Sequence, residues 1–151
     1  TEQNLMAAPP KYKRPYHFAT SAVRALGPSV TSVSLIRGLI DNMGQSLFAW
    51  ETPDGYPDQM EFWSGLVIAR WNAANVIAGS TASTFNFNVT PFVGSSAESG
   101  AALIVDRVFG GEVSETFRTR LADYLRPSPT NVTRVREAVG LALSSSQFQW
   151  Y

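Results

Sequence analysis

The sequence contains no cysteine among its 151 residues and only one histidine, His17. Without cysteine, a disulfide framework, a thiolate zinc site, an iron–sulfur cluster and a cysteine nucleophile are all excluded, and the cellular compartment stays open. A single histidine also argues against a transition-metal site built by this chain alone. We therefore expect neither a metal nor a cofactor.

Charge is scarce as well, because only 16% of the residues are charged and twelve basic side chains cancel twelve acidic ones. A protein that neutralises phosphates needs a clear excess of Lys and Arg, so we expect no nucleic-acid partner. The two signs are nevertheless separated, with a basic excess in residues 1–40 and only acids in residues 41–63. These segments can attract each other or a partner, although a solvated surface is the simpler interpretation.

Long apolar runs are missing too. The most apolar stretch, residues 62–78, is interrupted by Arg70, Asn72 and Asn75, so nothing approaches the ~18 uninterrupted residues of a membrane span. We expect no transmembrane segment in this chain. The polar and then proline-rich start lacks a basic-then-apolar signal region, and we interpret Thr1 as a processed or truncated terminus.

Hydrophobic residues, by contrast, make up 44% of the chain and aromatic residues 12%. That is enough for one domain with its own core. We interpret residues 1–14 as an extended, Pro/Lys-rich lead or linker and residues 15–151 as a single α-helical domain. Apolar side chains recur at three- and four-residue spacing, which predicts a mainly α fold: an irregular bundle of about six helices with long aromatic-rich loops.

Capping residues and helix breakers set the expected helix boundaries. The first predicted helix runs from residue 15 to Gly27, the second from a Thr31 N-cap to Gly44, and the third over 60–78. The fourth runs from a capping box of Ser95 and Glu98 to Gly110, and the fifth begins after a Ser114 cap. The last begins at Thr130 and is followed by a terminal turn capped at 144–146. Residues 79–94 are predicted mainly as an extended loop, although the alternation in 84–89 also fits a short strand.

Two of these segments carry more specific expectations. The helix over 60–78 is apolar on nearly all sides, so we expect it to lie centrally, against more than one neighbour. The loop over 45–59 keeps apolar side chains that are costly to expose, so we expect it to pack onto the domain.

The segment of residues 50–63 is the best candidate for a binding site, because it combines acids with aromatic rings. Paired carboxylates can serve glycoside hydrolysis or hold a hard cation, and aromatic faces beside acids suit sugar stacking. The spacing fits no calcium-loop signature, and turn chemistry explains Asp54 followed by Gly55 equally well. The candidate binding residues are Trp50, Glu51, Asp54, Tyr56, Asp58, Glu61 and Trp63. Core packing is the preferred interpretation of Trp63 and Trp71, which lie eight residues apart on one predicted helix.

A charge inside an otherwise apolar helix must be paired. We therefore interpret Arg70 as a structural buried charge, paired with an acid such as Asp58, Glu61 or Asp106. His17 is the natural acid–base candidate near neutral pH, but no nucleophile pattern surrounds it, so a structural role is preferred. The sequence assigns no catalytic residue.

Five sequence pieces occur in a fixed order along the chain. They are KRP-x-x-F followed by A-x-R-A-L-G (residues 13–27), M-G-Q-x-L-F (43–48), T-P-D-G-Y-P (52–57), F-W-S-G-L-V-I-A-R-W-N (62–72) and R-V-R-x-x-V-x-L-x-L-S-S-x-Q-F-Q (134–149). Together they resemble the C-terminal part of the bacterial domain-of-unknown-function family 1800 over almost the whole chain. Two positions depart from the family pattern: Tyr56, where the family tends to have Trp, and the final Ser-Ser-Gln-Phe, where it favours Ser-Pro-Glu-Phe.

The resemblance implies a mainly helical protein several hundred residues long, often exported, of which this chain would be a C-terminal fragment or cleaved half. It brings no established activity. We therefore expect a structural or binding module of an exported bacterial protein, periplasmic or extracellular, that docks on the rest of its own polypeptide or a larger assembly. The alternative is a carbohydrate-binding or hydrolase-like domain, with a glycan partner at the acidic, aromatic loop 50–63.

Overall fold

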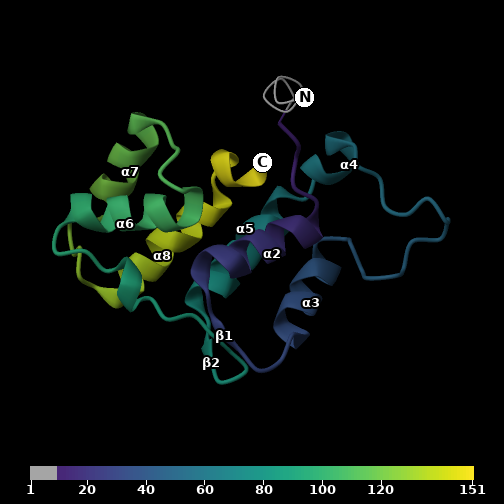
Figure 1. The fold of residues 1–151 in the computed structure, drawn as a ribbon, viewed down its shortest axis with the longest axis horizontal. Helices are drawn as coiled ribbons and strands as arrows, with labels where there is room; N and C mark the ends of the chain where they lie inside the picture. The colour runs from purple at the N-terminus through teal and green to yellow at the C-terminus, as the bar shows by residue number, and fades with distance from the viewer. Residues whose placement is uncertain (1–9) are drawn as a thin grey trace, which may run out of the picture.

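The computed structural model describes residues 10–151 and shows a mainly helical fold (Figure 1). The elements follow in the order α2 (Pro15–Leu26), β1 (Ser29–Val30), α3 (Ser34–Asn42), α4 (Met60–Ser64), α5 (Val67–Gly79), β2 (Thr81–Ala82), β3 (Phe85–Asn86), the 3-10 turn η1 (Thr90–Phe92), α6 (Ala97–Phe109), α7 (Glu115–Leu125), α8 (Val132–Ser144) and the 3-10 turn η2 (Ser146–Gln149). The predicted mainly α, irregular helical bundle is confirmed.

The centre of the bundle is the contact between α5 and α8, with α2 touching both α5 and α6, and α6 packed on α7. Small side chains let the central pair approach closely. Ala74 of α5 and Ala138 of α8 are fully buried, and a Cβ added at Gly140 would lie only 2.6 Å from Asn75 Oδ1. A side chain at position 140 would therefore require the Asn75 amide to move away from α8.

The helix ends follow the predicted chemistry with small shifts. Gly27 ends α2 in the left-handed conformation at φ 55°, as predicted. The cap of α6 is Ser96, one residue later than predicted, and its capping-box partner is Ser99 instead of Glu98. Asn131, and not Thr130, caps α8 by accepting the Arg134 N–H at 3.0 Å. In each shifted case a neighbouring polar side chain caps the helix instead.

The predicted Thr31 cap is wrong, because a small sheet holds that residue. β3 pairs with β1 on one side and with β2 on the other, both antiparallel. The N–H groups of Thr31 and Ser32 both donate to Thr84 O, at 3.0 and 3.2 Å. The Thr31 hydroxyl, which would have capped the helix, donates to Ser83 O at 3.3 Å, and α3 begins only at Ser34. The alternation over 84–89 thus contains one short strand.

The helix predicted over 60–78 breaks in two at Gly65, which ends α4, and Leu66, which precedes α5. Glycine is a poor helix former, which fits the position of the break. The break separates Trp63, which is fully buried, from Trp71, which is 49% exposed. The core interpretation therefore holds for Trp63 and is wrong for Trp71.

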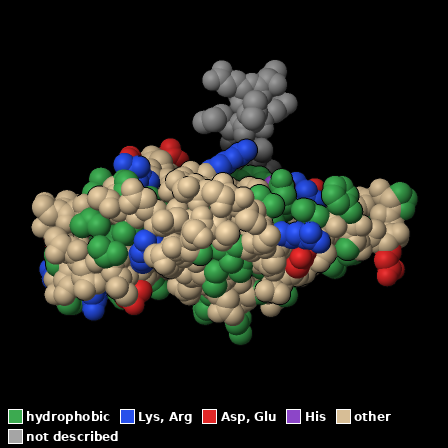
Figure 2. Space-filling model, turned by 90° about the horizontal axis from the view of Figure 1, so that it is seen from below, with side chains coloured by type: hydrophobic (Ala, Val, Ile, Leu, Met, Phe, Trp, Pro, Cys, Tyr) green, Lys and Arg blue, Asp and Glu red, His purple; other side chains and the backbone are tan. Residues whose placement is uncertain are grey.

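The loop between α3 and α4 extends from one end of the molecule in both views (Figures 1 and 2). Its two halves behave differently. Leu47 and Phe48 are exposed, and the Phe48 backbone has φ 61°, so the expectation that the loop packs down is wrong there. Trp50 and Tyr56 are half-buried and belong to an aromatic cluster described below.

No helix within residues 10–151 has both the length and the apolar character needed to cross a bilayer.

Candidate functional site

Residues 11–13 lie antiparallel to residues 149–151, and we call this pairing the terminal clasp. Backbone N–H groups of the first strand donate to the second at 2.9 and 2.8 Å, and a third bond of 3.1 Å returns. Tyr12 stands opposite Trp150 with ring centroids 5.1 Å apart, edge to face. The clasp thus joins the start of the described chain to its end, whereas residues 1–9 of the predicted lead lie outside the described residues.

Arg70 of α5 packs directly against the terminal clasp and is only 1% exposed. Its Nη2 donates to Lys13 O at 2.7 Å and its Nη1 donates to Gln149 Oε1 at 3.0 Å. The guanidinium carbon lies 4.6 Å from the centroid of the Tyr12 ring, within cation–π range. One buried cation therefore ties α5 to both strands of the clasp.

The partners of Arg70 differ from those predicted. None of the expected acids pairs with it, and within residues 10–151 it forms no ion pair. Burial lowers the pKa of Arg70 and the neighbouring Tyr12 opposes that shift. Arginine stays charged despite such a shift, so a buried cation is held here by neutral acceptors and aromatic rings.

Lys13 is the second buried cation of the terminal clasp, and it is not among the candidate site residues predicted from the sequence. Its Nζ donates to Phe148 O at 2.9 Å and lies 4.0 Å from the centroid of the same ring. Burial lowers the pKa of Lys13 from 10.5 to about 8. The sequence signal that could have identified Lys13 is the family resemblance, because Lys13, Arg70 and Gln149 all lie in the sequence pieces that carry it.

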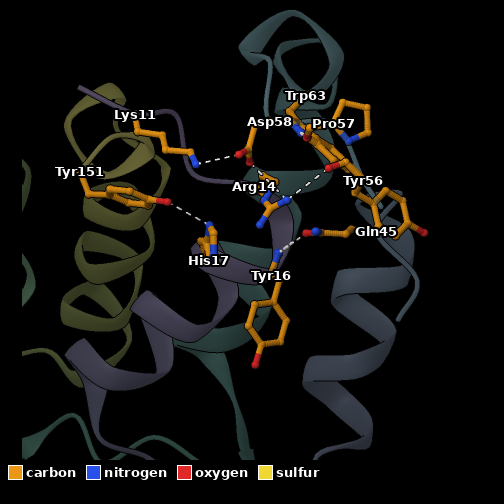
Figure 3. Close-up of polar contacts among 10 residues, drawn as sticks. All are labelled: Lys11, Arg14, Tyr16, His17, Gln45, Tyr56, Pro57, Asp58, Trp63 and Tyr151. Atoms are coloured by element: carbon orange, nitrogen blue, oxygen red, sulfur yellow. Dashed lines mark hydrogen bonds and ion pairs between the residues drawn. The ribbon is translucent and has the colours of Figure 1, made fainter. Parts of the chain in front are cut away.

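The acidic loop reaches the basic segment through Asp58 (Figure 3). Asp58 Oδ2 lies 3.0 Å from Lys11 Nζ and Oδ1 lies 3.2 Å from Arg14 Nη1. The hydrogen bond from Lys11, followed by the charge of Arg14, lowers the pKa of Asp58. The two oppositely charged segments thus pair with each other, although Asp58 itself remains exposed.

Hydrogen bonds fix the first end of this loop at the start of α2 and its second end at α4 (Figure 3). Gln45 Oε1 accepts the N–H of Tyr16 at 2.7 Å, which satisfies one of the donors left open in the first turn of a helix. The Trp63 indole N–H donates to Pro57 O at 2.8 Å. The loop is therefore anchored where it leaves α3 and where it enters α4.

Four aromatic rings gather at the α4 end of the loop, and we call them the aromatic cluster: Trp50, Tyr56, Phe62 and Trp63. Neighbouring centroids are 4.7–5.8 Å apart. Three of the predicted binding residues are thus brought together, with Trp63 buried at the base. Phe62, which is 47% exposed, is a member that the sequence prediction left out. Partly exposed rings on a buried base could contact an apolar ligand face.

The predicted acids do not form a comparable group. Glu51, Asp54 and Glu61 are exposed, and Asp54 accepts a hydrogen bond from the neighbouring Thr52 hydroxyl. Within residues 10–151 no three carboxylate or imidazole groups come close enough to hold a metal ion. A glycosidase acid needs a raised pKa, whereas the pKa of Asp58 is lowered.

His17 lies at the edge of the terminal clasp, with Nδ1 3.1 Å from the Tyr151 hydroxyl (Figure 3). Burial, followed by the charge of Arg14, lowers the pKa of His17. The histidine is therefore neutral near pH 7 and serves as a hydrogen-bonding contact between α2 and the C-terminal strand.

The outer face of α5 is exposed and uncharged, and it carries four apolar side chains beside the amides of Asn72 and Asn75. The apolar members are Val67, Ile68, Trp71 and Val76, of which Ile68 is 72% exposed. The opposite face holds the buried residues that contact α8 and α2. The expectation that this segment lies centrally, against more than one neighbour, is therefore met, although its outer face stays exposed.

A comparison with family models matches residues 1–150 to the family described as "Protein of unknown function (DUF1800)". No curated protein and no solved structure gives a significant match. The match covers the terminal clasp up to residue 150, the aromatic cluster and the α5 face in one continuous stretch. The chain therefore belongs to the DUF1800 family.

Proposed function

We propose that this chain is a structural or binding module that docks on the rest of its own polypeptide through the outer face of α5. The observation that carries the proposal is the exposure of Val67, Ile68, Trp71 and Val76 on one side of a central helix. A helix at the surface of a bundle normally turns polar residues to water, and contiguous apolar patches mark interaction sites.

The composition of this face supports an apolar partner segment. The exposed positions of α5 also include Asn72, Asn75 and Gly79, so none of them carries a charge. Covering such a surface removes apolar area from water at about 25 cal/mol per Å². The length that the family resemblance implies makes another segment of the same polypeptide the partner we propose; a separate subunit would be the other outcome of the test.

The substitution Ile68→Glu tests the docking proposal. A charge on this face should lower the melting temperature of the full-length polypeptide but leave that of residues 1–151 nearly unchanged. Val33→Glu is the matched control, because Val33 is 70% exposed and lies outside α5. Equal effects of Ile68→Glu in both forms would contradict the proposal. Loss of a co-purifying protein, instead of lower stability, would identify a separate subunit.

The aromatic cluster supports carbohydrate binding as a second candidate function. Trp50, Tyr56 and Phe62 leave part of their rings accessible beside the acidic side chains of the loop. Trp50→Ala should abolish binding in a glycan array or calorimetric titration, whereas Trp71→Ala, which removes an exposed indole elsewhere, should not. A glycan panel without any binder would reject this candidate.

The lowered pKa and the ion pairs of Asp58 favour binding over hydrolysis within this second candidate. The double substitution Asp54→Asn and Asp58→Asn distinguishes glycan binding from glycan hydrolysis. Glycan binding that survives it, without any hydrolysis by the unaltered protein, is the expected result.

We also propose that the parent protein is exported, on the strength of the family resemblance. Fractionation of native cells, followed by N-terminal sequencing of the protein, tests this proposal; recovery in the cytoplasmic fraction would reject it.

A further inference from the structure

A cavity of about 320 Å³ lies between the terminal clasp and the end of α6. Val108 and Phe109 of α6 line it together with Phe148 of η2 and Lys13 of the clasp. The cavity is separate from the aromatic cluster, because none of the four rings of that cluster lines it. It therefore offers a second enclosed space, and this one contains an amine.

The side chain of Lys13 is the part of that residue that borders the cavity. Its backbone is used in the clasp, where the N–H donates to Gln149 O at 2.8 Å and the carbonyl accepts from Arg70 Nη2 at 2.7 Å. Its Nζ lies 4.0 Å from the centroid of the Phe148 ring, which itself lines the cavity. The amine donates to Phe148 O at 2.9 Å and forms no ion pair within residues 10–151.

Lysine is rare in this chain, because only Lys11 and Lys13 stand among its twelve basic residues and all the others are arginines. A guanidinium does not lose its proton in proteins, whereas a lysine amine does so when it is buried. Lys11 is exposed and has the Asp58 carboxylate 3.0 Å away, which favours its charged form. Lys13 has only a neutral acceptor, so the two amines differ in their chemistry.

Burial lowers the pKa of Lys13 from 10.5 to about 8. At pH 7.5 about a quarter of such an amine is neutral, compared with about 0.1% of an ordinary lysine. The charged residues that face Lys13 are Arg70, at its backbone carbonyl, and Glu112, on the cavity wall. A neutral amine in an apolar setting is a nucleophile that attacks carbonyl carbons.

The cavity wall favours an uncharged carbonyl compound. Phe109, Phe148 and Trp150 supply aromatic surface, and Gln147 adds an uncharged amide. Lys13 is the only cation among the described residues that line the cavity, and Glu112 is the only acid. Once the amine has reacted, an anionic compound would face Glu112 without a cation to offset the repulsion.

We propose that Lys13 is a nucleophilic amine that condenses with a small, uncharged aldehyde bound in this cavity. The lone pair of Nζ forms a bond to the carbonyl carbon, and the carbonyl oxygen takes the displaced electron pair and a proton. The oxygen then leaves as water while nitrogen loses its remaining proton, which gives an imine. The step needs no oxidant or reductant, and it does not depend on the docking role of α5.

The experiment exposes the protein briefly to benzaldehyde at pH 7.5, fixes the imine with cyanoborohydride and locates the benzyl group by peptide mass mapping. We expect Lys13 to carry about tenfold more label than Lys11, although Lys11 is the more exposed residue. Unfolding in urea should remove this difference. Equal labelling of the two lysines in the folded protein, or a preference for Lys11, would overturn the proposal.

The anionic analogue 4-formylbenzoate tests the role of the cavity wall. It should label Lys13 several-fold less than benzaldehyde does, and Glu112→Gln should remove most of that difference. Glu98→Gln is the matched control, because Glu98 is exposed and does not line the cavity. Equal labelling of Lys13 by the two aldehydes would show that the wall does not select the carbonyl compound and would overturn the proposed class.

A space-filling variant assigns the labelling to the cavity. Val108→Trp should lower benzaldehyde labelling of Lys13 about fivefold or more and leave that of Lys11 unchanged, because Val108 lines the cavity. Val132→Trp, at an exposed position of α8, is the control and should change neither. Unchanged labelling of Lys13 in a folded Val108→Trp variant would contradict binding of the aldehyde in this cavity.

Discussion

The terminal clasp and the loop of residues 45–63 both join a cation to distant parts of the chain, but they do so in opposite environments. In the clasp, Arg70 is 1% exposed and bonds to neutral acceptors. In the loop, Lys11 and Arg14 pair with the exposed carboxylate of Asp58. Water screens the ion pairs of Asp58 but not the hydrogen bonds of the buried Arg70. The cations of the two regions should therefore differ greatly in their contribution to the free energy of unfolding.

Residues 45–63 nevertheless include one fully buried side chain, Trp63, and replacing it should have the largest effect on the free energy of unfolding. Trp63→Ala leaves a cavity beneath the aromatic cluster and should lower the free energy of unfolding by about 3–5 kcal/mol. Phe62→Ala removes a ring that is 47% exposed and should cost clearly less. Urea denaturation of both variants measures the difference; equal costs would mean that the cluster is not held by its buried base.

Arg70→Ala should have the next largest effect. It removes the bonds to Lys13 O and Gln149 Oε1 and leaves buried acceptors open, for an expected loss of about 2–4 kcal/mol. Arg126→Ala is the control, because Arg126 is exposed and pairs with Glu98 and Asp123. A surface pair of that kind is worth about 1 kcal/mol at most. Similar losses for the two arginines in chemical denaturation would show that burial does not set their importance.

Lys13 should give the clasp a pH dependence at alkaline pH, whereas that of the loop lies at acidic pH. Its pKa of about 8 lies below the ordinary 10.5. Between these values the unfolded chain binds more protons than the folded one, so the free energy of unfolding rises with pH across this window. Lys13→Met should remove that rise, whereas Lys11→Met should keep it. Denaturation at pH 7, 8, 9 and 10 measures it, and parallel curves for the protein and Lys13→Met would contradict the prediction.

Asp58→Asn should have the smallest effect, and it should weaken further in high salt because the carboxylate is exposed. The pKa of Asp58 is lowered in the folded protein, so its contribution is present above the ordinary value of 3.8 and is lost as pH falls through the folded value. The difference in melting temperature between protein and variant should therefore be largest at pH 7 and shrink as the pH is lowered below 3.8. A difference that stays the same down to the lowest pH at which the protein is folded would require a cause other than the ion pairs.

The sequence predicted the helical elements better than the contacts between them. Gly27 and Ser114 end and begin helices as predicted, because capping depends on the few residues next to the helix end. Thr31 does not cap α3, because its hydroxyl and its N–H bond to Ser83 and Thr84, more than fifty residues later in the chain. No local pattern contains that information.

Only part of the candidate site was predicted, again because local patterns do not show contacts between distant residues. Trp50, Tyr56 and Trp63 were named from their nearness in the sequence, and the structure brings their rings together. The terminal clasp was not predicted, because Lys13 and Gln149 meet Arg70 across separations of 57 and 79 residues. The pieces that carried the family resemblance contained these residues without indicating that they touch.

The sequence by itself determined the helical class, most helix ends and the need for Arg70 to find partners, because periodicity, caps and the cost of burying a charge act locally. The tertiary structure decided which partners Arg70 has, that Asp58 pairs with Lys11 and Arg14, and which face of α5 meets water. These outcomes depend on how segments far apart in the chain are packed. Apolar side chains of the same kind are therefore buried in the core on one face of α5 and exposed on the other.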